Sequence, residues 1–301
     1  MTRDDRRGRA AGVAAALVAV SIWAGWIPVT RLGVVTRLAP ADIAALRFGT
    51  AALVLAPLFL LHIREVPWRR PGPLFAMLVG AGVPYFLLFA YGLRLASSGQ
   101  GGVLGPGATS VLAALLAWLA LGERPRPRRL AGLAVTAAGV AVVVLHDALA
   151  GGTRIAGFAL ILAAALGWAA YTVASRALML RPVVNAATVA VLNAVAFLPG
   201  YFALGGGARL AAVPLADLAL QAFYQGILAA VVALIAFAFA IGRLGAAAAA
   251  GFSPLTPVLV AVFGWMLLGD AVDAATVAGL AAVAAGVLIA NSAVGVATSR
   301  R

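Results

Sequence analysis

The chain has 301 residues, of which 64% are hydrophobic and only 10% are charged, and its mean hydropathy is +1.07. A soluble domain carries about 25% charged residues, so this composition excludes a soluble domain. It predicts a protein embedded in a lipid bilayer. In a soluble protein a net charge of +13 would indicate a nucleic-acid partner, but here the arginines lie between apolar segments. The chain has no cysteine, which excludes disulfides and Cys-ligated metals.

Apolar segments of about 20 residues, the length that crosses a bilayer, follow one another along the whole chain. Clusters of Arg, Pro and Gly separate them. In chain order the predicted spans are 11–32, 40–61, 73–94, 98–121, 128–146, 155–177, 184–204, 217–241, 246–268 and 274–295. The expected fold class is therefore an all-α integral membrane protein with ten transmembrane helices. The first span continues past signal-peptide length, so we expect it to be an uncleaved helix.

Arginine is distributed unevenly between the loops. If the N-terminus is cytoplasmic, the arginine-rich segments 1–10, 62–72 and 122–129 all lie inside, whereas the outer loops carry few arginines. Positively charged loops remain on the cytoplasmic side during insertion. We therefore expect a multi-pass protein of the inner (plasma) membrane with both termini in the cytoplasm.

The sequence repeats itself at an interval of about half its length. SIWAGWIPVTR at 21–31 aligns with LGWAAYTVASR at 166–176, which matches Trp with Trp, Trp with Tyr and Arg with Arg. AWLALGE at 117–123 aligns with GWMLLGD at 264–270. Glycines that follow these last segments also coincide. Two homologous halves follow from these matches.

Each half contains five predicted spans, which is an odd number, so the second half must enter the membrane from the opposite side. We expect a first five-helix repeat at 1–148 and a second, inverted one at 149–301. The loop after Glu123 is rich in arginine and the loop after Asp270 has none, which agrees with opposite orientations. Inverted repeats are typical of secondary transporters, although channels can be built in the same way.

Several of these segments resemble the EamA-type family of the drug/metabolite transporter superfamily. They are PADIAALRF at 40–48, the W-x-x-L-G-E/D ends of the fourth and ninth spans, and AFYQGIL at 222–228. The resemblance covers nearly the whole chain. It implies a ten-helix inner-membrane carrier whose central cavity is lined by spans 1, 3, 4, 6, 8 and 9, with spans 5 and 10 in support. It does not indicate a substrate.

The glycine-rich stretch GQGGVLGPG at 99–107 has the G-x-x-x-x-G spacing of a phosphate-binding loop. Ala108 stands where that motif needs lysine, and the chain contains no lysine, so a phosphate site is excluded. Two interpretations remain and can coexist. Small residues let helices pack closely in lipid, and prolines in these spans can act as hinges at a cavity wall. The hinge candidates are Pro106, Pro254 and Pro257.

Aromatic and polar side chains on the expected cavity helices are the candidates for substrate contact, with ordinary packing as the alternative. They are Trp23, Trp26, Tyr85, Gln100, Thr109, Trp168, Tyr171, Tyr224, Gln225, Ser253 and Thr256. Arg47 is the clear charge within a span, so it is a possible clamp for a carboxylate. It could equally be a structural anchor that extends toward the membrane surface near Asp42. For Glu123 and Asp270, at helix ends, we expect a role in capping the helix that follows.

No Asp or Glu occupies the centre of a predicted span, which weakens a proton-relay mechanism. We therefore expect a secondary transporter that exports amino acids or small amphipathic metabolites by alternating access. The alternatives are a facilitator or channel, and a multidrug-type proton antiporter. The spans offer no nucleophile with a base and no metal-binding set, so we expect no enzymatic activity, no metal and no cofactor. The expected partners are the bilayer and a small-molecule substrate, without nucleic acid, for a monomer or homodimer.

Overall fold

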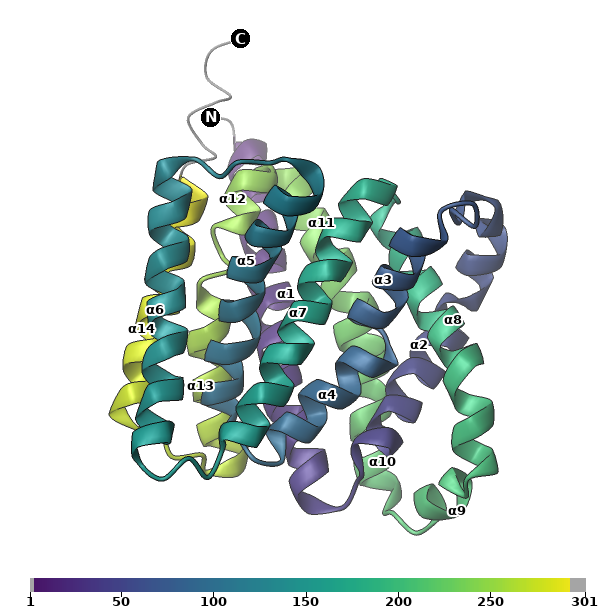
Figure 1. The fold of residues 1–301 in the computed structure, drawn as a ribbon. Coiled ribbons are helices and arrows are strands. Elements are labelled where there is room, and N and C mark those ends of the chain that lie inside the picture. The colour runs from purple at the N-terminus through teal and green to yellow at the C-terminus, as the bar shows by residue number, and fades with distance from the viewer. Residues whose placement is uncertain (1–2, 293–301) are drawn as a thin grey trace.

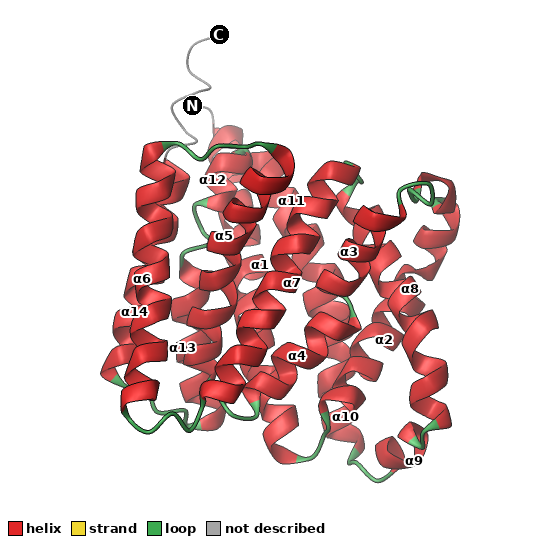
Figure 2. Cartoon of the chain, in the orientation of Figure 1, coloured by secondary structure: helices red, strands yellow, loops and turns green. Residues whose placement is uncertain are grey.

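The computed structural model describes residues 3–292, and the side-chain environments of 8–245 and 248–290. Within this part of the chain all the regular structure is helical, as Figure 2 shows. The elements in chain order are α1 (Arg3–Thr36), α2 (Pro40–Leu61), the 3₁₀ turn η1 (Ile63–Glu65), α3 (Pro71–Ala81), α4 (Val83–Leu93), α5 (Ser98–Leu121), α6 (Pro127–Leu149), α7 (Ile155–Leu178), α8 (Pro182–Ala203), α9 (Gly206–Ala211), α10 (Leu215–Gln221), the π-helix η2 (Ala222–Val232), α11 (Ala233–Leu244), α12 (Ala246–Ala250), α13 (Leu255–Leu268) and α14 (Ala274–Ser292).

Nine helical segments of the described chain are long and apolar enough to cross a membrane, and the apolar helix at Ala274–Ala290 is somewhat shorter. They correspond in order to the ten predicted spans, so the all-α membrane fold class is confirmed. The predicted spans 40–61 and 98–121 have the same bounds as α2 and α5. Three spans that we predicted as single helices are composite: α3 with α4, α10 with η2 and α11, and α12 with α13.

The break between α3 and α4 lies at Gly82, two residues before Pro84. The amide of Asn193, on α8, spans this break. Its Oδ1 accepts from the backbone N–H of Val83 at 2.9 Å, and its Nδ2 donates to the carbonyl oxygen of Leu78 at 3.2 Å. Backbone polar groups freed inside a membrane protein need such partners because lipid offers none. The broken helix is thus completed by a side chain from the other half of the molecule.

The eighth span is irregular at the corresponding place in the second half. Residues 222–232 wind as a π-helix between α10 and α11. At Gly226 a Cβ would lie 2.5 Å from the Cβ of Thr50, so this glycine allows η2 to approach α2 closely. Spans three and eight are both the third helix of their half. Irregular backbone inside membrane proteins occurs where protein or a water-filled cavity surrounds it.

Helices of the two halves pack against each other throughout the molecule. α6 packs against α14 at one end of the molecule and α2 packs against α8 at the other, with α1, α5 and α7 between them (Figure 1). α1 runs from the upper to the lower face in this view, and α7 runs from the lower to the upper. We call the face where α1 begins and residues 122–126 lie the N-terminal face. The face where α1 ends and residues 269–273 lie is the opposite face.

Glycines allow the closest helix contacts. A Cβ on Gly132 would lie 2.5 Å from the carbonyl oxygen of Gly286, and one on Gly139 would lie 2.9 Å from that of Gly279. The glycines that coincide between the repeats therefore face each other crosswise between α6 and α14. Backbones this close maximise van der Waals contact between helices in lipid, where no hydrophobic drive brings helices together.

The glycine-rich start of α5 serves the same purpose. A Cβ on Gly101, Gly102 or Gly105 would lie within 2.9 Å of a side chain on α4 or α13. α5 itself continues without interruption through Pro106. These contacts agree with the packing interpretation of the stretch 99–107.

Candidate functional site

Aromatic rings from both halves meet in the interior of the bundle. The ring centroid of Trp26, on α1, lies 4.9 Å from that of Phe89 and 6.2 Å from that of Tyr85, both on α4. Tyr85 continues to Trp168 at 4.9 Å, and Trp168 continues to Tyr171 at 5.0 Å, both on α7. We call these five residues the aromatic cluster. The equivalent stripes of the two repeats are thus joined through Tyr85, which lies just after the helix break.

Arg47, on α2, lies beside this cluster. Its guanidinium carbon is 5.5 Å from the centroid of Trp26, 5.6 Å from that of Phe86 and 5.8 Å from that of Phe48. One guanidinium nitrogen donates to Oε1 of Gln225 at 3.0 Å. The side chain is half-buried. Among side chains that the structure describes, no carboxylate lies within 4.0 Å of this guanidinium.

A chain of hydrogen bonds holds Gln225 in place. Its Nε2 donates to Oγ1 of Thr30 at 2.8 Å and to Oε1 of Gln221 at 3.3 Å. Gln221 in turn donates to the carbonyl oxygen of Val29 at 2.7 Å. Since the amide nitrogen of Gln225 is committed to these acceptors, its oxygen is directed to Arg47. The π-helix η2 brings Gln225 to this position between α1 and α2.

The indole N–H of Trp26 is the exception in this polar environment. The Trp26 side chain is buried, with 9% of its surface exposed, and its Nε1 has no hydrogen-bond partner in the described part of the chain. A buried donor without a partner costs about 1–3 kcal/mol. The Trp26 ring lies beside Arg47, and a ligand acceptor that reached this N–H would remove the cost.

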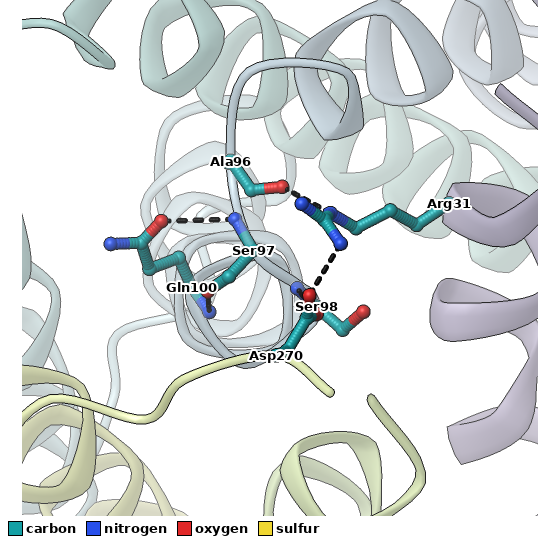
Figure 3. A network of polar contacts seen from close by, with 6 residues as sticks. All are labelled: Arg31, Ala96, Ser97, Ser98, Gln100 and Asp270. Atoms are coloured by element: carbon teal, nitrogen blue, oxygen red, sulfur yellow. Dashed lines mark hydrogen bonds and ion pairs between the residues drawn. The ribbon is translucent and has the colours of Figure 1, made fainter. Parts of the chain in front are cut away.

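Four other candidates lie outside this group. Trp23 packs on Phe237 of α11, with ring centroids 5.2 Å apart. Tyr224 donates to the carbonyl oxygen of Ile22 at 3.0 Å, which ties η2 to α1. Gln100 closes a capping box at the start of α5, as Figure 3 shows, and Thr109 makes a long contact of 3.5 Å from α5 to a carbonyl of α7.

The remaining candidates lie around the interruption between α12 and α13. Ser253 and Pro254 belong to the turn at 251–254, whereas Thr256 and Pro257 belong to the first turn of α13. The chain is thus non-helical at one proposed hinge, Pro254, and helical at Pro106. Whether either proline moves stays a prediction.

A second polar network lies where α1 ends, at the opposite face. Figure 3 shows Arg31 reaching the start of α5, where its Nε donates to the carbonyl oxygen of Ala96 at 2.8 Å, and pairing with Asp270. The other carboxylate oxygen of Asp270 accepts from the backbone N–H of Ser98 at 2.8 Å. The carboxylate is almost fully buried, with 6% of the side chain exposed. This network locks α1 and the start of α5 to the end of α13.

The repeat-equivalent residues form a matching pair at the N-terminal face. Arg176, at the end of α7, donates to both carboxylate oxygens of Glu123 at 2.6 and 2.8 Å. Here the side chains are 50% and 40% exposed. Arg31 corresponds to Arg176 and Asp270 to Glu123, so each ion pair joins one half to the other. One pair is buried and the other is exposed to solvent.

Two sequence interpretations need correction. We expected Asp270 and Glu123 to cap the helices that follow them, but both are engaged by arginines of the other half because the fold brings helix ends of the two halves together. The cap of α14 comes instead from Asp273, which accepts from the backbone N–H of Thr276 at 2.7 Å. Burial alone would raise the pKa of Asp273, but its hydrogen bonds with Thr276 hold that pKa below its usual value.

The second correction concerns Arg47. We considered Asp42 as the neighbour that anchors it at the membrane surface. Asp42 instead accepts hydrogen bonds from the hydroxyl of Tyr201 at 2.7 Å and from Nε of Arg209 at 3.1 Å. Arg47 lies a turn and more further along α2, facing the aromatic cluster, so Asp42 does not neutralise it.

Comparison with known proteins identifies the family. The model of the EamA-like transporter family matches the chain twice, at residues 10–145 and 155–292. A solved structure titled "Crystal structure of protein" has the same fold, with a TM-score of 0.57 and 20% sequence identity over 96% of this chain and 99% of that one. No curated protein matches the chain. The chain, a multi-pass membrane protein, therefore belongs to the EamA-like transporter family.

Proposed function

We propose that the protein is a secondary transporter that exports a small amphipathic metabolite across the inner membrane by alternating access. The observation that carries the proposal is the meeting of aromatic and polar side chains from both halves beside the helix break. An amphipathic molecule could be bound here by two kinds of group. The aromatic rings would contact its apolar part, and the guanidinium, the amide and the indole N–H would contact its polar part. A transporter places such a site at the interface of its repeats, near the middle of the membrane.

Alternating access is supported by the relation between the two ion pairs. We propose that 1–148 and 149–301 are inverted repeats and that each adopts the other's conformation when the transporter switches. Both pairs are formed in the described conformation, and we propose that the buried pair Arg31–Asp270 becomes exposed as the exposed pair Arg176–Glu123 becomes buried. In the described conformation the opposite face would be sealed and the N-terminal face open. Pro106, Pro254 and Pro257 are the proposed hinges for this movement.

We propose that the N-terminal face, and with it both termini, lies in the cytoplasm, which the arginine distribution supports. The described conformation would then accept substrate from the cell interior, as an exporter requires. We propose no enzymatic activity and no cofactor, and a monomer or homodimer in contact with lipid. A channel built on the same fold is the second candidate, because a repeat alone does not demand a saturable site.

Counterflow in liposomes tests the proposal. The purified protein is reconstituted in vesicles preloaded with a mixed pool of unlabelled amino acids and organic acids, and labelled compounds are screened for saturable accumulation. A transporter gives transient accumulation above equilibrium, whereas a channel gives flux that is linear in concentration. Linear flux without accumulation would contradict the proposal.

A pair of tryptophan variants locates the route. Trp168→Ala removes a ring of the aromatic cluster, and we expect it to lower counterflow severalfold. Trp265→Ala removes a ring that is 65% exposed on the outer surface of α13, and we expect it to leave counterflow unchanged. Equal loss in both variants, or in neither, would mean that the aromatic cluster is not part of the route.

A further inference from the structure

We infer that Arg47 and Trp26 bind the carboxylate of the transported molecule, so that the substrates are small organic monoanions with a flat apolar body rather than zwitterionic amino acids. The inference rests on the proposed function, because it names the substrate class of the same site. Two observations on the described part of the chain carry it: the Arg47 guanidinium has no carboxylate partner, and the buried indole N–H of Trp26 has no acceptor.

The charge of Arg47 is the first step. A charged group inside a protein is normally paired, since removing it from water is costly. Among the described residues, the guanidinium of Arg47 is contacted by the neutral amide of Gln225 and by three aromatic rings, and by no carboxylate within 4.0 Å. A guanidinium carries five N–H donors, of which this bond uses one. The other donors are available to an oxyanion, for which a planar guanidinium fork is well suited.

The indole of Trp26 is the second step. Its N–H is buried and has no acceptor among the residues that the structure describes, and the centroid of its ring lies 5.5 Å from the guanidinium carbon of Arg47. A carboxylate has two oxygens and can accept from both donors at once. A single ligand group would therefore neutralise the cation and satisfy the orphaned N–H. Neither purpose is served by an ammonium or by an apolar group.

The surroundings indicate the rest of the molecule. From Trp26 the aromatic rings continue through Tyr85 and Trp168, which favours a planar apolar body. In the described chain the carboxylates lie at helix ends or in loops, and Asp42 on the same helix is already engaged by Tyr201 and Arg209. An amino acid would thus leave its ammonium without a partner. A phosphate would need more than one cation.

Ligand binding by the full-length protein in detergent tests this inference without requiring transport. Phenylacetate is the probe. Phenylacetamide is the matched compound without the negative charge, and phenylalanine is the matched compound that adds an ammonium group. Binding is followed by tryptophan fluorescence and by the rise in thermal unfolding temperature. We expect phenylacetate to bind about tenfold or more tightly than either, as loss of a charge-assisted hydrogen bond predicts.

Variants assign the effect to the two residues. Arg47→Gln is expected to abolish the preference for phenylacetate over phenylacetamide, and Arg47→Lys to retain part of it. Trp26→Phe keeps the ring but removes the N–H, and should weaken phenylacetate binding severalfold with little change for phenylacetamide. Arg94→Gln removes an exposed arginine at the end of α4 and is the control, with no expected change.

Equal binding of phenylacetate and phenylacetamide, or a charge preference that survives Arg47→Gln, would overturn the inference. These outcomes are separable from failure of the proposed function. Binding that depends on Arg47 but is not accompanied by counterflow would support the carboxylate site and contradict the proposed transport function. Counterflow of neutral or zwitterionic compounds that Arg47→Gln does not change would support the transport function and contradict the carboxylate site.

Discussion

At the scale of single residues, Asn193 shows how one amide can hold a broken helix. We expect Asn193→Leu to lower the free energy of unfolding by about 1–3 kcal/mol, because the N–H of Val83 and the carbonyl of Leu78 would lose their partner away from water. Thermal unfolding in detergent measures this. The control is Thr172→Val on α7. It removes only a hydrogen bond from the hydroxyl to the carbonyl oxygen of Trp168, one turn earlier in α7, and should have a much smaller effect. A loss in Asn193→Leu no larger than in Thr172→Val would contradict the bridging role.

Some residues of the site could be predicted from the sequence, and others could not. Trp26, Trp168 and Tyr171 follow from the repeat, because equivalent aromatic positions are visible in the alignment. Asn193 does not follow, because its partners lie about a hundred residues away and neutral amides are common in helices. Trp23 belongs to the same stripe as Trp26 but turns to α11, since helical spacing fixes the face only to within the width of a stripe.

At the scale of helices, close packing depends on glycine at defined positions. A Cβ on Gly286 would lie 2.2 Å from Oγ1 of Thr136 and 2.5 Å from the carbonyl oxygen of Gly132, so Gly286→Ala should force α6 and α14 apart. We expect a loss of about 1–3 kcal/mol in the free energy of unfolding, as for overpacked cores. Gly200→Ala, on α8, has no atom within 4 Å of the new methyl group. Thermal unfolding should show this control unchanged or slightly stabilised, by up to about 1 kcal/mol.

The helices themselves were the most predictable level of the structure. Apolar length and the Arg, Pro and Gly breaks place α2 and α5 correctly, because the thickness of the bilayer sets their length. We did not predict the break in span three. Gly82 and Pro84 lie at it, but proline also occurs within continuous helices, as Pro106 does in α5. The π-helix has no local signal. Its close approach to α2 at Gly226 is a tertiary feature that the local sequence does not show.

At the scale of the whole molecule, the two ion pairs should bias the transporter in opposite directions. Asp270→Asn weakens the network that seals the opposite face and should favour the alternative conformation. The Arg176–Glu123 pair is exposed in the described conformation and would be buried in the alternative one. Because breaking a buried pair costs more than breaking an exposed one, Glu123→Gln should favour the described conformation. A conformational shift of about 1 kcal/mol changes the population ratio roughly fivefold. The chain has no cysteine, so a single one at Ser253 reports accessibility without background labelling.

The measurement is the rate at which a membrane-impermeant maleimide labels this cysteine from the N-terminal face. We expect Glu123→Gln to raise the rate and Asp270→Asn to lower it, with the larger effect in Asp270→Asn because its carboxylate is buried and also holds the start of α5. Asp147→Asn, which alters a pair within the α6–α7 turn, should leave the rate unchanged. If both variants changed the labelling rate in the same direction, the two ion pairs would stabilise the fold without selecting a conformation. Opposite changes in rate are expected only if each pair stabilises a different one of two conformations.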